Sequence, residues 1–125
     1  MPSTTTFKRG QVIVVNVPFS NHAGVKPRPA LVISAEAFHR NLHDLIVCPI
    51  SSQPRYYRHP GPGDCPLREW RAAGLRYPST VRISKVLAVD KQIIKRPLRP
   101  LGQQDLTRVE VGLRQALGLR GAIAP

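Results

Sequence analysis

Apolar and polar positions along the chain predict a series of short strands. Residues 10–18 (GQVIVVNVP) are rich in β-branched residues, apolar on both faces and ended by a proline, so they predict a strand that is buried on both sides. Residues 29–34 and 45–50 are short apolar runs of the same kind. Residues 80–90 alternate between apolar and polar positions and predict one longer strand, and residues 91–96 predict another.

One helix stands out against these strands. Apolar positions recur at helical spacing over residues 103–117, and Gly118 predicts its end. These positions are Leu106, Val109, Leu113, Ala116 and Leu117. Ser34 is placed to cap a short helix over residues 35–41. Residues 52–66, rich in Pro, Gly, Tyr and Arg, predict a poorly packed loop before a weaker strand signal at 67–70.

Short strands at this density, followed by one amphipathic helix, favour a mainly β fold, a small antiparallel barrel with a C-terminal helix packed on it. At 125 residues the chain is long enough for one domain and too short for two, and no linker or internal repeat divides it. We therefore expect a single domain over residues 1–125. Because the chain is small and has few aromatic residues, we also expect it to bury a face in a homodimer.

Net charge is the feature that points to a partner. Nineteen Lys and Arg stand against seven Asp and Glu, which gives +12, and fourteen of the basic residues are Arg. From residue 55 to residue 99 there are eleven basic and three acidic residues, so +8 of the charge lies there. Arg forms forked contacts with phosphate and stacks on bases, so a nucleic-acid partner is the leading inference. A charge that serves only solubility is the alternative, and an anionic membrane surface is less favoured.

The sequence also argues against several classes of protein. No apolar run approaches the ~20 residues that span a bilayer, and the first residues have no secretory-signal pattern. Two cysteines, Cys48 and Cys65, cannot build a disulfide scaffold, so we expect reduced thiols in the cytoplasm. These cysteines with His39, His43 and His59 match no closed zinc signature, so we expect no metal and no other cofactor.

Three features suggest chemistry on a phosphate. In Lys26-Pro27-Arg28-Pro29 the prolines restrict the backbone around Arg28 and favour a preorganised charge clamp, although a Pro-rich turn with an incidental Arg fits equally well. Ser51 ends a strand, where a hydroxyl can bind a phosphate oxygen but more often caps a turn. His22 lies in a polar loop, and its imidazole suits proton transfer near neutral pH.

Taken together, these segments resemble the PemK/MazF-like toxins. The resemblance covers residues 8–118 and rests on the order of GQVIVVNVPFSNHAGVKPRPALVIS, LIVCPISSQ and REWRAAGLRYPSTVRISKVLAVDKQIIKR before the helix. It implies an SH3-like barrel with a C-terminal helix, a homodimer, and neutralisation by a small acidic antitoxin protein, in a complex that binds DNA. It also implies cleavage of single-stranded RNA without metal, to a 2′,3′-cyclic phosphate and a 5′-hydroxyl.

The motifs of that family fall on particular positions of this sequence. The hallmark Arg of its Arg-Pro pair falls on Arg28, the strand-end hydroxyl of its I-[TS]-S motif on Ser51, and the loop histidine of some members on His22. Some members carry an acidic residue two positions after the Arg of the S-x-V-R strand; here Ser84 follows Arg82, so that carboxylate's role does not transfer. The residues expected to contact RNA are Lys26, Ser52, Gln53, Arg55, Tyr56, Tyr57, Arg82 and Lys85.

The expected chemistry needs no metal, because RNA carries its own nucleophile in the 2′-hydroxyl. In this interpretation Arg28 neutralises charge in the transition state, Ser51 holds a non-bridging oxygen, and His22 transfers a proton. Tyr56 and Tyr57 offer an aromatic surface to splayed bases, with loop packing or a dimer contact as the alternative. A non-catalytic RNA-binding barrel and a DNA-binding regulator are the competing functions, and the C-terminal helix is too weakly basic to favour the regulator.

Overall fold

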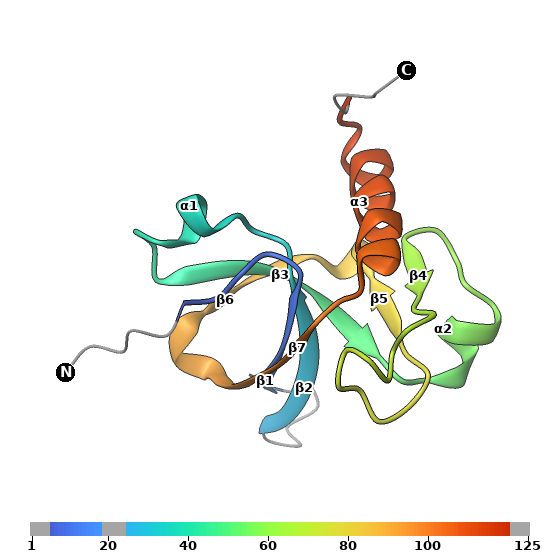
Figure 1. Cartoon of the computed structure of the whole chain (residues 1–125), viewed down its shortest axis with the longest axis horizontal. Coiled ribbons are helices and arrows are strands. Elements are labelled where there is room, and N and C mark those ends of the chain that lie inside the picture. The colour runs from blue at the N-terminus through green and yellow to red at the C-terminus, as the bar shows by residue number, and fades with distance from the viewer. Residues whose placement is uncertain (1–5, 19–24, 121–125) are drawn as a thin grey trace.

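One antiparallel sheet of seven strands, with a helix at the C-terminal end, makes up most of the described chain (Figure 1). The computed structural model describes residues 6–18 and 25–120. Its strands are β1 (Gln11–Pro18), β2 (Val25–Val32), β3 (Asp44–Ser51), β4 (Asp64–Pro66), β5 (Thr80–Arg82), β6 (Leu87–Asp90) and β7 (Ile94–Pro100). Its α-helices are α1 (Glu36–His39), α2 (Pro54–Arg58) and α3 (Gln103–Leu117), and two 3-10 turns are η1 (Ile83–Lys85) and η2 (Lys91–Ile93).

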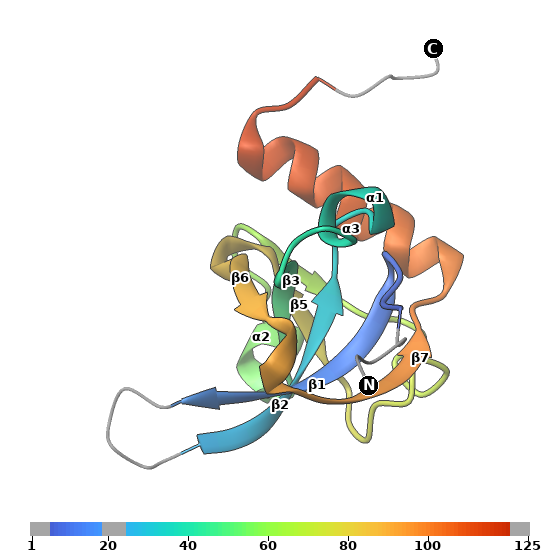
Figure 2. The same ribbon diagram turned by 90° about the vertical axis from the view of Figure 1, so that its left-hand side faces the viewer.

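The sheet is continuous but not closed. Its strands lie in the order β4-β5-β3-β2-β1-β7, and β6 pairs with β3 beside this path. Because β4 and β7 are the two ends of the path, no strand pairing among the described residues closes a barrel. Figure 2 shows the curved sheet with α3 lying across one end of it. The prediction of a mainly antiparallel β fold with a C-terminal helix is confirmed, and the barrel is an open one.

β1 is buried on both faces, as its pattern predicts. Val12 packs with Leu31 of β2 and Val109 of α3, whereas its neighbour Ile13 packs on the opposite side of the sheet with Val89 of β6. We call the first group the helix-side core: Val12, Leu31, Cys48, Ile50, Cys65, Leu67, Ala73, Val81, Ile83, Leu101 and Val109. The second group is the far-side core: Phe7, Ile13, Val15, Ala30, Val32, Leu45, Val47 and Val89. The chain's own side chains therefore cover both faces of β1.

The segment 80–90 is broken in the middle, so the prediction of one long strand is wrong. It forms β5, then the turn η1, then β6, and both strands pair with the same edge partner, β3. The alternation of apolar and polar residues does not reveal this break, because it continues through Arg82, Ile83 and Ser84, where the chain enters η1.

The register of β3 explains where the break falls. Between the pairs Val47–Leu87 and Ile50–Val81, two residues of β3 face five residues of the other segment. The three extra residues form η1. Pro49, one of the two on β3, has no N–H to donate, so little hydrogen bonding is lost where the pairing stops.

Two predictions about the segments around β3 are also wrong. Ser34 does not cap α1, whose N-cap is Ala35 with no side-chain hydrogen bond. Instead the Ser34 Oγ accepts a hydrogen bond from the Ile46 N–H (3.1 Å) and bonds the His39 Nδ1 (2.9 Å). Residues 52–66 are not a continuous loop, because they contain α2 and β4, but their packing is as sparse as predicted: α2 has no buried residue.

Other boundaries shift without changing the order of elements. β2 begins at Val25, four residues before the predicted start, and so includes Arg28. The weak strand signal at 67–70 corresponds to no strand, and β4 lies just before it. The last strand, predicted at 91–96, is preceded by η2 and continues as β7 to Pro100.

α3 has the bounds that its spacing predicts. It ends at Gly118, whose φ of 67° lies in the left-handed region that favours glycine. Gly112 lets the helix approach η1, since a Cβ at that position would lie 2.5 Å from the Ile83 Cδ1. Among the described residues, α3 and the shorter helices include no segment long and apolar enough to cross a membrane.

A buried carboxylate joins the start of α3 to the segment that follows β4. Asp105 is fully buried, and its two oxygens accept hydrogen bonds from the backbone N–H groups of Arg68 (3.1 Å) and Glu69 (2.9 Å). Arg108, one turn later, pairs with Asp105 at 3.1 Å and donates to the Pro66 carbonyl at 2.7 Å. A carboxylate in the first turn also interacts favourably with the helix dipole.

Replacing Asp105 with alanine should lower the free energy of unfolding by about 3–5 kcal/mol, because it leaves Arg108 and two backbone amides without their acceptor. Urea denaturation of the two proteins measures this difference. Glu110→Ala is the matched control on the same helix: its ion pair with Arg9 is solvent-accessible and should contribute about 1 kcal/mol or less. Equal losses for the two variants would contradict the role given to Asp105.

Candidate functional site

A cavity of about 270 Å³ opens on the far-side face of the sheet. Six elements contribute to its wall: β1, β2, β3, α2, β6 and the β5–η1 segment. Apolar side chains of the far-side core, among them Val15, Val47 and Val89, form its floor. The polar side chains that line it are those of Arg28, Ser51, Gln53, Tyr56, Arg82 and Lys85. All six were singled out from the sequence.

Strand geometry brings Arg28 and Ser51 together. Successive side chains of a strand alternate between the faces of the sheet, so Arg28 shares a face with Ala30 of the far-side core, and Ser51 with Val47. β2 and β3 pair with Ala30 opposite Pro49. The β2–β3 pairing ends at this position, and just beyond it Arg28 and Ser51 both line the cavity. The Ser51 Oγ also accepts a hydrogen bond from the Gln53 N–H (3.2 Å), which orients the turn into α2.

α2 carries Tyr56 into the cavity between two arginines. The Arg55 Nη2 donates a hydrogen bond to the Tyr56 hydroxyl at 2.8 Å. On the ring itself, the Arg82 guanidinium carbon lies 3.6 Å from the centroid, which is a close cation–π stack. The Arg55 hydrogen bond and the neighbouring Arg82 guanidinium lower the pKa of Tyr56 below its ordinary value, because they stabilise the phenolate.

A carboxylate that the sequence did not single out holds Arg82 in place. The Asp64 Oδ1 accepts a hydrogen bond from the Arg82 Nε at 2.5 Å, and its Oδ2 accepts one from the Gly61 N–H at 3.0 Å. Partial burial alone would lower the pKa of Arg82, but its interactions with Tyr56 and Asp64 raise it overall. The acidic partner of Arg82 thus lies on β4, the strand paired with β5, and not at position 84. Only strand pairing, which local sequence does not reveal, brings the two together.

The remaining candidates lie outside the cavity wall. Lys26 and Ser52 are exposed, and Arg55 reaches the cavity only through Tyr56. The Tyr57 hydroxyl donates to the Leu67 carbonyl at 2.9 Å, which is a packing role. His22 lies outside the described residues, and its role stays a prediction.

The charge of the cavity wall suits an anion. Arg28, Arg82 and Lys85 contribute three cations, and no carboxylate is among the residues that line this cavity. Asp64 neutralises part of the charge on Arg82 but approaches its Nε, so the other nitrogens of that guanidinium are not bound by this contact. Cations and hydroxyls above an apolar floor can hold a phosphate beside a sugar or base.

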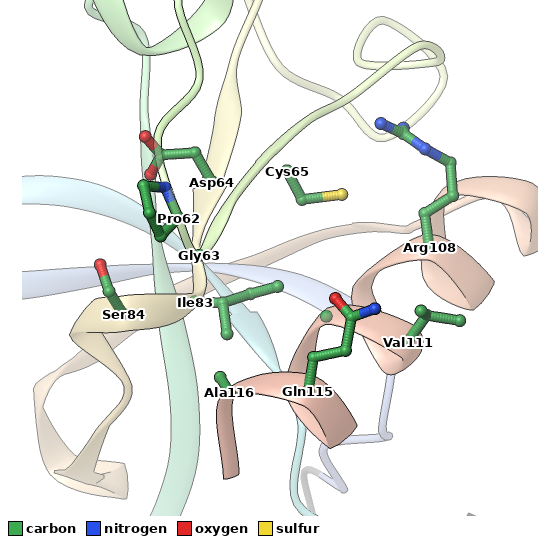
Figure 3. Close-up of a pocket in the computed structure, with 11 residues that line it drawn as sticks. Pro62, Gly63, Asp64, Cys65, Ile83, Ser84, Arg108, Val111, Gln115 and Ala116 are labelled. Carbon is green, nitrogen blue, oxygen red and sulfur yellow. The ribbon is translucent and has the colours of Figure 1, made fainter. Parts of the chain in front are cut away.

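A second, larger cavity of about 540 Å³ lies between α3 and the β4–η1 region. Figure 3 shows Arg108, Val111 and Gln115 of α3 on one side and Ser84 of η1 on the other. Asp64 belongs to this wall as well, with its carboxylate on the side away from Arg108. Asp64 lines the larger cavity and Arg82 lines the smaller one, so the Asp64–Arg82 ion pair lies between the two cavities.

The cysteines and His39 are structural. Burial raises the pKa of the Cys48 thiol to about 12 and also raises that of Cys65, so both resist ionisation. The two ring nitrogens of His39 bond Ser34 and the Phe7 carbonyl, the latter at 2.6 Å. In the part of the chain that the structure describes, no three His, Cys, Asp or Glu side chains gather at one point that could hold a metal ion.

Comparison with known proteins adds independent findings. The family profile of the PemK-like, MazF-like toxins of type II toxin-antitoxin systems matches residues 8–117. A search of curated proteins finds no matching sequence.

Solved structures share the fold at low sequence identity. A MazE-MazF structure from Deinococcus radiodurans has a TM-score of 0.74 at 23% identity, over 93% of this chain and 100% of that chain. An endoribonuclease in complex with its cognate antitoxin from a mycobacterial species has a TM-score of 0.71 at 17% identity, over 94% and 99% of the two chains. The Mycobacterium tuberculosis toxin MazF-mt6 has a TM-score of 0.71 at 18% identity, over 89% and 99%.

Proposed function

The chain belongs to the family of PemK-like, MazF-like toxins of type II toxin-antitoxin systems, and we propose that it is a toxin that cleaves single-stranded RNA without a metal ion. In this proposal it is an endoribonuclease whose products are a 2′,3′-cyclic phosphate and a 5′-hydroxyl. The observation that carries the proposal is the convergence of Arg28, Arg82, Lys85 and the Ser51 and Tyr56 hydroxyls on one cavity.

RNA cleavage by attack of the 2′-oxygen needs groups of these types. The 2′-oxygen attacks the phosphorus, negative charge builds on the phosphoryl oxygens, and the 5′-oxygen leaves. Arg28 and Arg82 stabilise that charge with forked N–H donors, and the Ser51 hydroxyl binds a non-bridging oxygen. His22 is our proposal for the group that accepts the 2′-hydroxyl proton, because its imidazole can do so near neutral pH.

Single-stranded RNA is the substrate class that the cavity fits. Its bases are free to splay away from the backbone, so a base or ribose can rest on the apolar floor while the phosphate meets the cations. Gln53, which precedes α2, and Lys85 of η1 also line the cavity, and we propose that they read or hold the flanking nucleotides. The net charge of +12 also favours a small acidic antitoxin as the protein partner.

Incubation of the purified protein with a fluorescent single-stranded RNA in EDTA tests the activity directly. Cleavage that yields cyclic phosphate and 5′-hydroxyl ends supports the proposal. Tight RNA binding without cleavage would instead favour the non-catalytic RNA-binding protein, and neither binding nor cleavage would reject both.

Arg28→Ala should slow single-turnover cleavage by about 10²–10³-fold, as loss of one oxyanion donor does. Arg28→Lys should rescue little, because an ammonium group cannot reproduce the fork. Ser51→Ala should cost about 1–2 kcal/mol, and Ser51→Thr should stay active because it keeps the hydroxyl. Arg40→Ala is the matched control, because Arg40 is exposed and lies outside the cavity. Cleavage by Arg28→Ala at the wild-type rate would remove Arg28 from the site.

RNA affinity should fall as salt rises, because phosphate contacts release bound counterions. If Arg28, Arg82 and Lys85 each neutralise one phosphate, the slope of log K against log salt is about −2, from −0.7 for each contact. Further contacts along the 55–99 segment would make it steeper. Fluorescence anisotropy across a salt series measures the slope, and Arg28→Ala should make it shallower by about 0.7. A flat response would show that phosphate neutralisation does not drive binding.

We further propose that the active unit is a homodimer. Since both faces of β1 are covered within the chain, a second copy has to bind elsewhere, and exposed apolar side chains remain at Phe38, Leu42, Val111 and Leu117. Sedimentation at micromolar concentration should give about twice 13.9 kDa. A monomer that still cleaves RNA would refute the dimer as the active unit.

A further inference from the structure

Tyr56 makes contacts that base stacking alone does not require. A tyrosine that only stacks on bases needs an open ring face and no particular partner for its hydroxyl. Here the Arg82 guanidinium lies 3.6 Å from the ring centroid, and the hydroxyl is held by Arg55 at 2.8 Å. The ring thus already carries a cation on one face, with the Arg55 guanidinium carbon 4.7 Å from its centroid as well, and Tyr56 lines the cavity that also holds Arg28 and Ser51.

RNA cleavage has a second proton transfer, for which the cavity offers few groups. The 5′-oxygen leaves as an alkoxide unless a proton reaches it as the P–O bond breaks. Arg28 and Arg82 are poor donors, because a guanidinium gives up its proton only at very high pH. The Ser51 hydroxyl is less acidic still. A phenol is a stronger acid than either, and Tyr56 lines the cavity. Lys85 lines it too, and an ammonium is an acid of about the same strength as a phenol. We favour Tyr56 because Arg55 and Arg82 hold its side chain in place.

We propose that Tyr56 is the general acid of the cleavage reaction, which donates its phenolic proton to the departing 5′-oxygen. This inference rests on the proposed ribonuclease function. The O2′–P bond forms, the P–O5′ bond breaks, and its electron pair goes to O5′, which takes the proton from the Tyr56 hydroxyl. The 2′-hydroxyl proton passes to a basic side chain or to water. Tyr56 then regains a proton from water, so the transesterification neither gains nor loses protons overall.

The charges around Tyr56 favour this role. The phenolate that remains after donation lies against Arg55 of its own helix and Arg82 of β5. Arg28 of β2 and Lys85 of η1 line the same cavity, and the carboxylate behind Arg82 is Asp64 of β4. Arg55 and Arg82 lower the pKa of Tyr56 from its ordinary value of 10.0, with the Arg55 hydrogen bond as the largest cause. A phenol with a lowered pKa gives up its proton more readily.

A substrate that needs no general acid tests the proposal. Wild type and Tyr56→Phe are compared on two RNAs of one sequence, one with the normal 5′-oxygen and one with sulfur at that bridging position. Phenylalanine keeps the ring and its stacking but has no proton to donate. We expect Tyr56→Phe to slow cleavage of the oxygen substrate by about 100-fold or more. Since a thiolate leaves without protonation, the two proteins should cleave the sulfur substrate at similar rates.

Tyr77→Phe is the matched control, because Tyr77 is exposed on the turn before β5 and does not line the cavity. Equal circular dichroism and thermal unfolding of the variants show that folding is unaffected. The pH profile gives a second readout: wild-type cleavage should fall as pH rises through the pKa of Tyr56, below 10.0, since the phenolate has no proton to give. That alkaline limb should vanish in Tyr56→Phe.

The outcomes separate this inference from the proposed function. Equal losses of Tyr56→Phe on both substrates, or no loss on the oxygen substrate, would overturn the general-acid role while the wild-type cleavage still supports the ribonuclease. Absence of cleavage by the wild type on either substrate would overturn both.

Discussion

Strand β3 is the constraint on which the site depends, because it has partners along both edges. β2 pairs with one edge, and β6 and then β5 pair with the other. Where the second edge is interrupted, near Pro49, the crossing segment has to accommodate three extra residues, and it does so as η1. Arg82 and Lys85 stand at the two ends of that interruption and line the cavity. The interruption of the sheet therefore also supplies two of the cavity's three cations.

Much of the fold follows from local pattern. The bounds of α3 and the two-sided burial of β1 were predictable, because helical spacing and a run of β-branched residues act over a few neighbours. The break at 83–85 was not, since it is set by the register of β3, more than thirty residues away. The short elements α2 and β4 were missed for a related reason: Pro and Gly mark turns, and only packing against β5 and the core makes Asp64–Pro66 a strand.

The candidate site, like the fold, could be predicted from local sequence only in part. Arg28 and Ser51 could be found from motifs, and the paired strands bring them to one cavity. Asp64 could not, because it contacts Arg82 only through the β4–β5 pairing, eighteen residues apart in sequence. Tyr56 and Tyr57 look equivalent as neighbours in the sequence. The helix separates them, so that one lines the cavity and the other packs its hydroxyl against a backbone carbonyl.

The burial of β1 between two cores has a consequence for how the protein is made. β1 pairs with β7, and Gln11 lies opposite Pro100. One of its covers is α3, the last helix of the chain. β1 is synthesised well before β7 and α3, its neighbours on that edge and on that face. Because such distant contacts have to form before the sheet is complete, we expect β1, which also contributes to the cavity, to reach its native packing only once β7 and α3 are present. The packing of the cavity floor is therefore expected to be a late step of folding.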